Sequence, residues 1–373
     1  MNPEDFLGQA LSLARSVPKS TLPNPPVGAV LVRNGRVLAT GAHLGPGNPH
    51  AEIVALEQAA ERGENVRGAT LFTTLEPCCH SSPGKRTPPC VPRLIREGIA
   101  EVWIGCADPN PEVAGRGAAE LEKAGVKVHW AAEPAQAEDL IREFRVGILE
   151  HRSWVHLKWA QTLDGKAAAS DGSSRWITGK AARVESHRLR AKYQAVLVGA
   201  GTLRQDDPSL TVRHLEGNQP ARLILAGNQA LPEQSRVFHD EWADKTWVIA
   251  PYGSPVREQA ARLVQARVLE GSLGNVEELT RTLYQAGFGS VLVEGGPTVL
   301  GAFFGAGLWD AASVFVAPKI LGQGLTVPFW SGVENIGKAR RLRLVQSRSL
   351  GEDLLIELEP LSQTIKENSC LQV

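Results

Sequence analysis

One imidazole and two thiol side chains lie within a short stretch of the chain, and they constrain its fold more than any other feature. His50 stands at the start of a helical pattern, and Cys78 and Cys90 each follow a proline. An imidazole and two thiolates are suitable ligands for a tetrahedral zinc ion, whose fourth position stays open for water in a catalytic site. The chain is therefore expected to fold so that these three side chains meet around zinc.

Glu52, two residues beyond His50, is expected to serve the chemistry of this site rather than to bind the metal. Zinc lowers the pKa of a bound water from about 15.7 to about 7. A nearby carboxylate can accept that water's proton and pass it to a leaving amine, and the order His-x-Glu followed by Pro-Cys is typical of zinc deaminases. Taken singly, a histidine beside a glutamate is usually a surface feature and a buried cysteine usually packs as a small hydrophobic residue, but their combination favours zinc.

The spacing of the two cysteines departs from the usual Cys-x-x-Cys pair. Cys78 and Cys90 are separated by residues 79–89, which add side chains to the mouth of the expected pocket. Cys79 remains an alternative to Cys78 as a ligand, although Pro77-Cys78 occupies the place that the signature gives to its ligand.

Several further motifs accompany the ligands. They are Pro23-Asn24-Pro25-Pro26-Val27-Gly28-Ala29-Val30, Leu75-Glu76-Pro77-Cys78-Cys79-His80, Thr87-Pro88-Pro89-Cys90, Asp108-Pro109-Asn110-Pro111 and Val113-Ala114-Gly115-Arg116-Gly117. With these motifs the chain resembles the bifunctional deaminase/reductase family of riboflavin biosynthesis, and residues 156–324 look like the reductase half of that family. The resemblance implies an α/β protein with an N-terminal three-layer α/β/α cytidine-deaminase-like zinc domain and a C-terminal dihydrofolate-reductase-like α/β domain that uses NADPH.

Length and cysteine usage agree with two enzyme domains in a reducing compartment. A chain of 373 residues exceeds the size at which one hydrophobic core usually keeps growing. The polar stretch Glu150-His151-Arg152-Ser153 is the best boundary, so we expect a deaminase domain over 1–149, a reductase domain over 150–360 and a disordered tail over 361–373. Three of the five cysteines crowd into residues 78–90, which indicates metal binding rather than a disulfide framework.

Charge and hydropathy exclude two classes of partner. Lys plus Arg equals Asp plus Glu at 40 each, so no global basic field exists to bind nucleic acid by its phosphates. The N-terminus is acidic where a signal peptide would be basic, and no apolar run approaches the roughly 18 residues needed to span a membrane. We expect a cytoplasmic enzyme with a small-molecule substrate, and the family resemblance suggests a homo-oligomer.

Hydrophobic periodicity predicts alternating helices and strands. The pair Asn34-Gly35 indicates a tight hairpin, and the alternation favours a largely parallel sheet in the first half, with each zinc ligand where a helix begins. In this half, helices are expected over 5–16, 51–62, 90–97, 117–124 and 135–149, and strands over 27–32, 37–40, 69–74, 101–106 and 126–129. In the second half, strands are expected over 155–159, 195–198, 222–225, 246–250, 290–294, 312–316 and 354–358.

The strand over 290–294 runs into Gly295-Gly296-Pro297-Thr298 and then into an apolar helix. Glycines at such a turn let backbone amides approach an anion, and the helix dipole favours negative charge there, so a nucleotide phosphate would fit. Many strand-to-helix turns use glycine for geometry alone, and by itself this loop is weak support. The resemblance implies that the cofactor contacts fall on Ala160, Trp176, Thr202, Asp206 and the turn Gly296-Pro297-Thr298.

The resemblance also implies which residues bind substrate. In the reductase half they are Ser174, Arg190, Leu210, Arg213 and Glu294, and in the deaminase half they are Asn24, His43, His80 and Arg86. Arg190 and Arg213 are suited to bidentate pairing with a ribose phosphate, although solvated surface arginines are the alternative explanation. His80 is an alternative metal ligand, but its nearness to Cys78 makes binding to the same ion awkward, so we expect it to face the substrate or to support the ligands.

Two successive reactions follow from the resemblance. The first is zinc-dependent hydrolytic deamination of 2,5-diamino-6-(5-phosphoribosylamino)pyrimidin-4-one, with Glu52 as the proton shuttle. The second is NADPH-dependent reduction of the ribosyl side chain to give 5-amino-6-(5-phosphoribitylamino)uracil, for which Lys158 and Asp206 are candidate proton donors. A deaminase with an inactive reductase-like domain, a deaminase of nucleosides, deoxycytidylate or tRNA, and a zinc-stabilised binding module are the alternatives.

Overall fold

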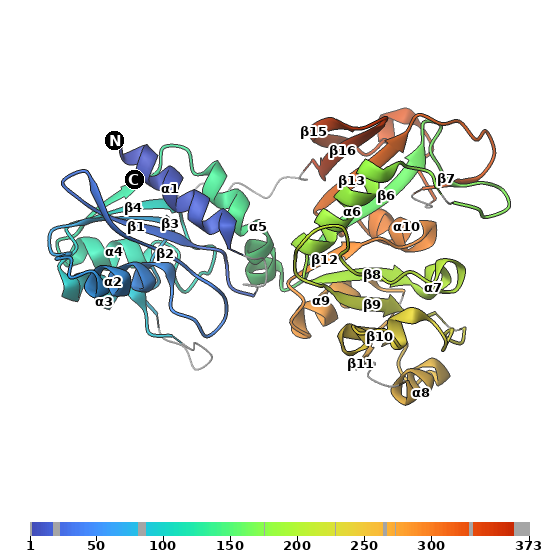
Figure 1. Ribbon diagram of the computed structural model, residues 1–373, viewed down its shortest axis with the longest axis horizontal. Helices are drawn as coiled ribbons and strands as arrows, with labels where there is room; N and C mark the ends of the chain where they lie inside the picture. The colour runs from blue at the N-terminus through green and yellow to red at the C-terminus, as the bar shows by residue number, and fades with distance from the viewer. Residues whose placement is uncertain are drawn as a thin grey trace. The chain divides into compact units, whose positions relative to one another are not determined.

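The computed structural model describes residues 2–17, 23–80, 87–174, 176–227, 229–263, 267–272, 274–327 and 331–361. Its contacts divide the chain into two compact units (Figure 1). The first comprises Met1–Ser153 and Leu283–Gly289, and the second comprises Trp154–Thr282 and Ser290–Val373. Most of the segment expected to be a tail, from residue 362 onward, lies outside the described residues.

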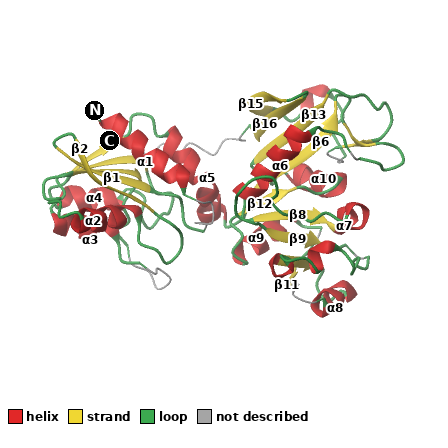
Figure 2. Cartoon of the chain, in the orientation of Figure 1, coloured by secondary structure: helices red, strands yellow, loops and turns green. Residues whose placement is uncertain are grey.

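The first unit is built on a sheet of five strands in the order β2-β1-β3-β4-β5. Figure 2 shows its strands in yellow and the helices beside them in red. β1 is antiparallel to both of its neighbours, whereas β3, β4 and β5 are parallel, so β1 alone opposes the common strand direction of this sheet. The predicted strands and the largely parallel sheet are confirmed. The strands are β1 (Gly28–Arg33), β2 (Arg36–Ala42), β3 (Thr70–Leu75), β4 (Glu101–Cys106) and β5 (Lys127–Trp130).

A tight hairpin joins β1 to β2 at the predicted pair. Asn34 and Gly35 have φ angles of 53° and 73°, the positive values that a two-residue type I′ turn requires. Gly41 on β2 lies against the start of the next helix, because a Cβ atom at this position would stand 2.1 Å from the Ala51 carbonyl oxygen. This close approach seats the helix N-terminus that carries His50.

Helices cover both faces of this sheet and complete the predicted three-layer α/β/α architecture. Alternate residues of a strand face opposite sides of a sheet, and the two cores of this unit follow that rule. Phe6 of α1 shares one core with Val30 and Phe72, whereas Leu56 of α2 shares the other with Leu31. The helices are α1 (Pro3–Ser16), α2 (Ala51–Glu61), α3 (Cys90–Glu97), α4 (Arg116–Lys123) and α5 (Ala135–Glu150).

The second unit is built on a nine-stranded sheet in the order β11-β10-β9-β8-β12-β6-β13-β16-β15. All neighbours from β11 to β13 are parallel, and β16 is antiparallel to both of its neighbours. The central parallel strands are buried on both faces, which explains the continuous apolar run of β8. The strands are β6 (Trp154–Thr162), β8 (Ala195–Gly199), β9 (Ala221–Leu225), β10 (Thr246–Ala250), β11 (Arg267–Glu270), β12 (Ser290–Val293), β13 (Ala311–Ala317), β15 (Leu342–Leu350) and β16 (Asp353–Pro360).

The strands predicted in the second half are all present, whereas the sequence pattern does not predict β11 and β15 at the two edges of the sheet. β11 has four residues and β15 is largely exposed, so neither carries the pattern of a buried strand. A short pair, β7 (Lys166–Ala168) and β14 (Leu325–Thr326), stands apart from the main sheet. The helices in this part of the chain are α6 (Lys180–Lys192), α7 (Ala200–Asp206), α8 (Pro255–Arg262), α9 (Val276–Gln285) and α10 (Pro297–Ala306).

Within the described residues, every helix is too short or too polar to cross a membrane.

Candidate metal centre and active site

The structure brings the three predicted zinc ligands together in the first unit. His50 is the N-cap residue of α2, and Cys90 is the first residue of α3. Cys78 lies in the loop after β3, so the expectation that every ligand begins a helix is wrong for this residue. Its carbonyl oxygen accepts hydrogen bonds from the amides of Cys90 and Val91 at 3.0 and 3.2 Å, which ties the loop to the start of α3.

The donor atoms fit one tetrahedral zinc ion. His50 Nδ1 lies 3.2 Å from Cys90 Sγ and 3.4 Å from Cys78 Sγ, and the three ligand atoms lie within 4.8 Å of one another. Zinc bonds of about 2.0 Å to nitrogen and about 2.3 Å to sulfur, at tetrahedral angles, hold these atoms about 3.5 Å apart. Cys79 packs against the hydrophobic core instead, so Cys78 is the thiol that joins the metal-binding group among the described residues.

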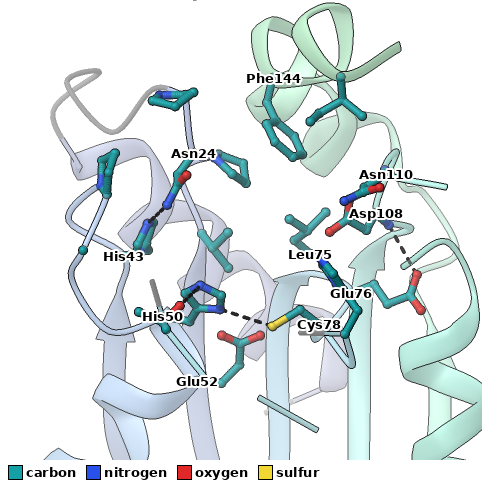
Figure 3. A pocket seen from close by; sticks show the side chains of 18 of the residues that line it. Asn24, His43, His50, Glu52, Leu75, Glu76, Cys78, Asp108, Asn110 and Phe144 are labelled. Carbon is teal, nitrogen blue, oxygen red and sulfur yellow. Dashed lines mark hydrogen bonds between the residues drawn. The ribbon is translucent and has the colours of Figure 1, made fainter. Parts of the chain in front are cut away.

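Glu52 lies beside the ligands with its carboxylate buried (Figure 3). It is the second residue of α2, and its Oε2 atom lies 3.6 Å from Cys90 Sγ. Burial raises the pKa of this carboxyl above its ordinary value, and the neighbouring His50 opposes the shift. A carboxyl group at this position is suited to take up and release a proton during catalysis.

A cavity of about 600 Å³ opens beside these side chains. Asn24 and His43 lie on its wall, where Asn24 Nδ2 is 2.9 Å from His43 Nε2. His43 Nδ1 is 2.9 Å from the carbonyl oxygen of Pro49, so Nδ1 donates to that oxygen and Nε2 accepts from Asn24. Both ring nitrogens of the buried His43 are engaged, and the histidine therefore fixes the orientation of the Asn24 amide.

The other two residues predicted to bind the deaminase substrate are His80 and Arg86. His80 lines the same cavity and is partly buried, and its Nε2 atom lies 3.6 Å from Glu112 Oε2. It does not belong to the group of ligand atoms found among the described residues, which argues against its alternative role as a metal ligand. Arg86 lies outside the described residues.

Glu76, Asp108 and Asn110 also line the cavity, although their positions in the sequence predict no individual role for them. Glu76 is buried, and its carboxylate accepts hydrogen bonds from the amides of Asp108, Gly115 and Ala118 at 3.3, 2.9 and 3.2 Å. It thereby holds the segment before α4 against the loop that carries the zinc ligand. A charged residue between an apolar strand and Pro-Cys is the sequence signal that could have revealed it.

In the second unit, predicted cofactor residues gather where β8 and β12 end. α7 follows β8 directly and carries Thr202 and Asp206, and α10 follows β12 after a glycine turn. A Cβ atom at Gly296 would stand 3.3 Å from Thr202 Oγ1, so the two segments are in contact. Gly296 is the N-cap residue of α10, followed by Pro297 and Thr298, and no side chain among the described residues caps this helix. Its N-terminus can therefore receive an anion.

Ala160, Ser174 and Trp176 come from other segments of the second unit. Ala160 lies on β6, the strand that pairs with β12. Ser174 and Trp176 lie in the segment before α6, and the Trp176 side chain is 64% exposed. Gln205 of α7 donates to the carbonyl oxygen of Gly172 at 2.7 Å, which joins the segment containing Ser174 to the predicted cofactor residues on α7.

Glu294 and Arg190, both predicted to bind substrate, form a buried ion pair. Arg190 Nε and Nη2 each lie 2.8 Å from a carboxylate oxygen of Glu294, and Lys158 Nζ lies 3.7 Å from Glu294 Oε2. The phosphate pairing expected for Arg190 is not the arrangement in this structure, because its bidentate edge is occupied, and the surface explanation is wrong for this residue too. Burial acts to raise the pKa of Glu294, but the charges of Arg190 and Lys158 outweigh it and lower the pKa to about 2.

Leu210 and Arg213 flank the loop that Arg190 contacts. The Thr211 carbonyl oxygen accepts from Arg190 Nη1 at 3.0 Å. Leu210 is buried and has a φ angle of 55°, whereas Arg213 is exposed. Of the two arginines expected at the phosphate, Arg213 is therefore the exposed one.

Comparisons with known proteins agree with this geometry. A family model described as the cytidine and deoxycytidylate deaminase zinc-binding region matches residues 1–106, and one described as the RibD C-terminal domain matches residues 153–356. The riboflavin biosynthesis protein RibD of Aquifex aeolicus is 40% identical, over 95% of this chain and 97% of its own length. That of Escherichia coli is 36% identical, over 96% and 99%.

Solved structures match over the same extent. A diaminohydroxyphosphoribosylaminopyrimidine deaminase/5-amino-6-(5-phosphoribosylamino)uracil reductase from Thermotoga maritima is 36% identical with a TM-score of 0.84, over 96% of this chain and 98% of that one. A RibD structure from Acinetobacter baumannii is 35% identical with a TM-score of 0.85, over 96% and 99%. The chain therefore belongs to the RibD family of riboflavin biosynthesis and is a bifunctional enzyme with a zinc-binding deaminase domain and an NADPH-dependent reductase domain.

Proposed function

We propose that the first unit removes the 2-amino group of 2,5-diamino-6-(5-phosphoribosylamino)pyrimidin-4-one as ammonia, and that the second unit reduces the ribosyl side chain of the product to give 5-amino-6-(5-phosphoribitylamino)uracil. The proposal rests on the meeting of His50, Cys78 and Cys90 within 4.8 Å of one another, beside the buried Glu52, at a cavity that His50, Glu52 and Cys78 line. The Thermotoga maritima relative is named for both activities, which supports this choice of substrates.

For the deamination, His50, Cys78 and Cys90 would hold a zinc ion, which would lower the pKa of a bound water to about 7. Glu52, whose carboxylate lies beside the ligands, is placed to accept a proton from that water and to deliver it to the departing amino group. Asn24 binds the pyrimidine through its amide, whose orientation His43 maintains.

The phosphoribosyl part of this substrate extends away from the metal towards the mouth of the cavity. We assign its binding to His80, which lines the cavity, and to Arg86, which the family resemblance implies. A histidine and an arginine are suitable partners for a phosphate because both can donate charged hydrogen bonds.

In the reduction, NADPH supplies the hydride. Its phosphates are expected at the N-terminus of α10, because the helix is uncapped there and α7 adjoins it. Arg213 pairs with the substrate phosphate, while Arg190 holds the carboxylate of Glu294 in place. The proposed cofactor contacts are Ala160, Trp176, Thr202, Asp206, Gly296, Pro297 and Thr298, and the proposed substrate contacts are Ser174, Arg190, Leu210, Arg213 and Glu294.

We also propose domain bounds of 1–149 and 150–360, a tail over 361–373, a cytoplasmic location and assembly as a homo-oligomer. The location rests on the clustering of cysteines in a metal site, which is typical of a reducing compartment. Limited proteolysis tests the domain bounds, and size-exclusion chromatography with light scattering tests the assembly.

The proposed function is tested by measuring ammonia release and NADPH oxidation by zinc-loaded protein supplied with the diaminopyrimidine substrate. Both signals are expected from the wild-type chain, and both are expected to be lost in Glu52→Gln, because the reductase then receives no substrate. Supplying the deaminated intermediate to Glu52→Gln should restore NADPH oxidation. Ammonia release without NADPH oxidation would instead indicate a deaminase with an inactive reductase-like domain. The absence of both signals in the wild-type chain would overturn the assignment.

A further inference from the structure

The two ring nitrogens of His50 contact different neighbours. Nδ1 lies 3.2 Å from Cys90 Sγ and 3.4 Å from Cys78 Sγ, whereas Nε2 lies 2.9 Å from the hydroxyl oxygen of Thr87. His50 is the N-cap residue of α2, yet its side chain makes no capping hydrogen bond to the helix. The orientation of the ring is therefore set by the sulfur atoms on one side and by Thr87 on the other.

A metal ion at the sulfur atoms assigns a protonation state to each nitrogen. The nitrogen that binds zinc must be without a proton, so the other nitrogen of the neutral ring carries the hydrogen and acts as a donor. A threonine hydroxyl can accept this hydrogen bond. Partners of this kind fix the tautomer of a metal-binding histidine and increase its basicity as a ligand.

We propose that Thr87 is a positioning residue that holds His50 with Nδ1 towards the zinc ion and with the hydrogen on Nε2. This inference rests on the zinc site of the proposed function but not on the identity of the substrate. Thr87 would act on the metal through His50 and would take no part in the transfer of protons to substrate.

The position of Thr87 in the chain suits this role. Pro88 and Pro89 separate it from the ligand Cys90, and proline fixes its own φ angle and restricts the residue before it to extended conformations. Pro89 is indeed extended, with φ −63° and ψ 146°, and α3 starts directly after it. One stiff segment therefore supplies both a zinc ligand and the hydrogen-bond partner of another ligand, so the two are placed together.

Thr87 also lines the cavity, which raises a competing explanation in which its hydroxyl contacts the substrate. Thr87→Val removes the hydroxyl with little change in shape, and Thr87→Ser retains it. If Thr87 positions His50, the affinity for Zn²⁺ should fall by roughly 10–100-fold in Thr87→Val and should stay near the wild-type value in Thr87→Ser. The measurement is competition for Zn²⁺ against a chromophoric chelator, in the absence of substrate.

Thr40→Val is the matched control, because Thr40 lies on β2 of the same unit. Its backbone amide donates a hydrogen bond to Gln58, and the substitution retains that amide. Zinc affinity should be unchanged in this variant. An unchanged zinc affinity in Thr87→Val together with a raised KM would assign Thr87 to the substrate and overturn the proposal.

A second measurement needs no variant and guards against misfolding of Thr87→Val. The nitrogen chemical shifts of His50 in the zinc-loaded wild-type chain, labelled with ¹⁵N-histidine, should show metal on Nδ1 and hydrogen on Nε2. Metal on Nε2 would contradict the proposal. A chain that binds zinc in this manner but releases no ammonia from the diaminopyrimidine would overturn the proposed function and leave the role of Thr87 standing.

Discussion

Replacing Glu294 with glutamine is expected to destabilise the second unit by roughly 3 kcal/mol at pH 7. The carboxylate faces Arg190 and Lys158, and only 7% of its side chain is exposed. The pKa of Glu294 falls from 4.5 to about 2, a difference of about 2.5 units at roughly 1.4 kcal/mol each. A neutral amide would also leave the buried cations without their counter-charge, for which losses of about 3–5 kcal/mol are typical.

The same carboxylate makes the stability of this unit depend on pH. Because the folded pKa of Glu294 lies below its unfolded value, its contribution is complete above about pH 4.5 and is lost as the pH falls towards 2. By pH 3.5 the wild-type chain is expected to have lost roughly 1 kcal/mol of this contribution. The difference in stability between wild type and Glu294→Gln should narrow by the same amount.

Urea unfolding followed by pulsed hydrogen–deuterium exchange on peptides from β6 and β12 measures this unit separately, since two units need not unfold in one transition. Glu334→Gln is the control, because Glu334 pairs with Lys338 at an exposed position, where ion pairs contribute little. A Glu294→Gln variant that destabilised the unit no more than Glu334→Gln at pH 7 would contradict the stabilising role of the buried ion pair. So would a stability difference from wild type that did not narrow in acid.

Three further predictions concern the deaminase half. Glu52→Gln should lower the rate of ammonia release by about 100-fold or more while the bound zinc, measured by atomic absorption, stays at one wild-type equivalent; loss of the metal would mean that Glu52 is a ligand. Removal of zinc by a chelator should abolish ammonia release but not NADPH oxidation with the deaminated intermediate, and added Zn²⁺ should restore the first activity; loss of both activities would contradict the separation of the two sites. Gly117→Ala places a Cβ atom 2.1 Å from the Pro77 carbonyl oxygen, so it should lower the stability by about 1–3 kcal/mol and weaken zinc retention. Gly8→Ala is the control, because nothing lies within 4 Å of a Cβ atom there, and it should change neither property. Thermal unfolding measures the stability, and zinc titration measures the retention of zinc.

Much of the fold could be predicted because its signals are local. Asn34-Gly35 determines its hairpin through the φ angles that these two residues adopt readily. Pro88-Pro89 marks the start of α3 because proline is tolerated where a helix begins. The edge strands β11 and β15 were not predictable in this way, because an exposed or very short strand has no buried face to impose a pattern on its residues.

The candidate site also combines features that could be predicted from the sequence with features that could not. Its donor set, one histidine and two cysteines with a glutamate beside them, was recognisable because metal binding limits the residue types that can serve. The place of Glu76 between an apolar strand and Pro-Cys could have marked it as a residue of the site. Its three backbone amide partners could not be predicted, because every residue except proline offers the same amide. Residues 81–86, among which Arg86 is expected to bind substrate, lie outside the described residues.

Residue types and their order were sufficient to indicate the candidate zinc ligands, Glu52 as the candidate proton shuttle, and an α/β deaminase followed by an α/β reductase. The folded structure was needed to show that His50 turns Nδ1 towards the sulfur atoms and Nε2 towards Thr87. The folded structure was also needed to show that Arg190 pairs with Glu294, 104 residues away, so that this edge of its guanidinium is not open to a phosphate. Residue type restricts which chemistry a side chain can perform, but a partner far along the chain is selected by packing, which removes water and makes one charge pairing outweigh the others.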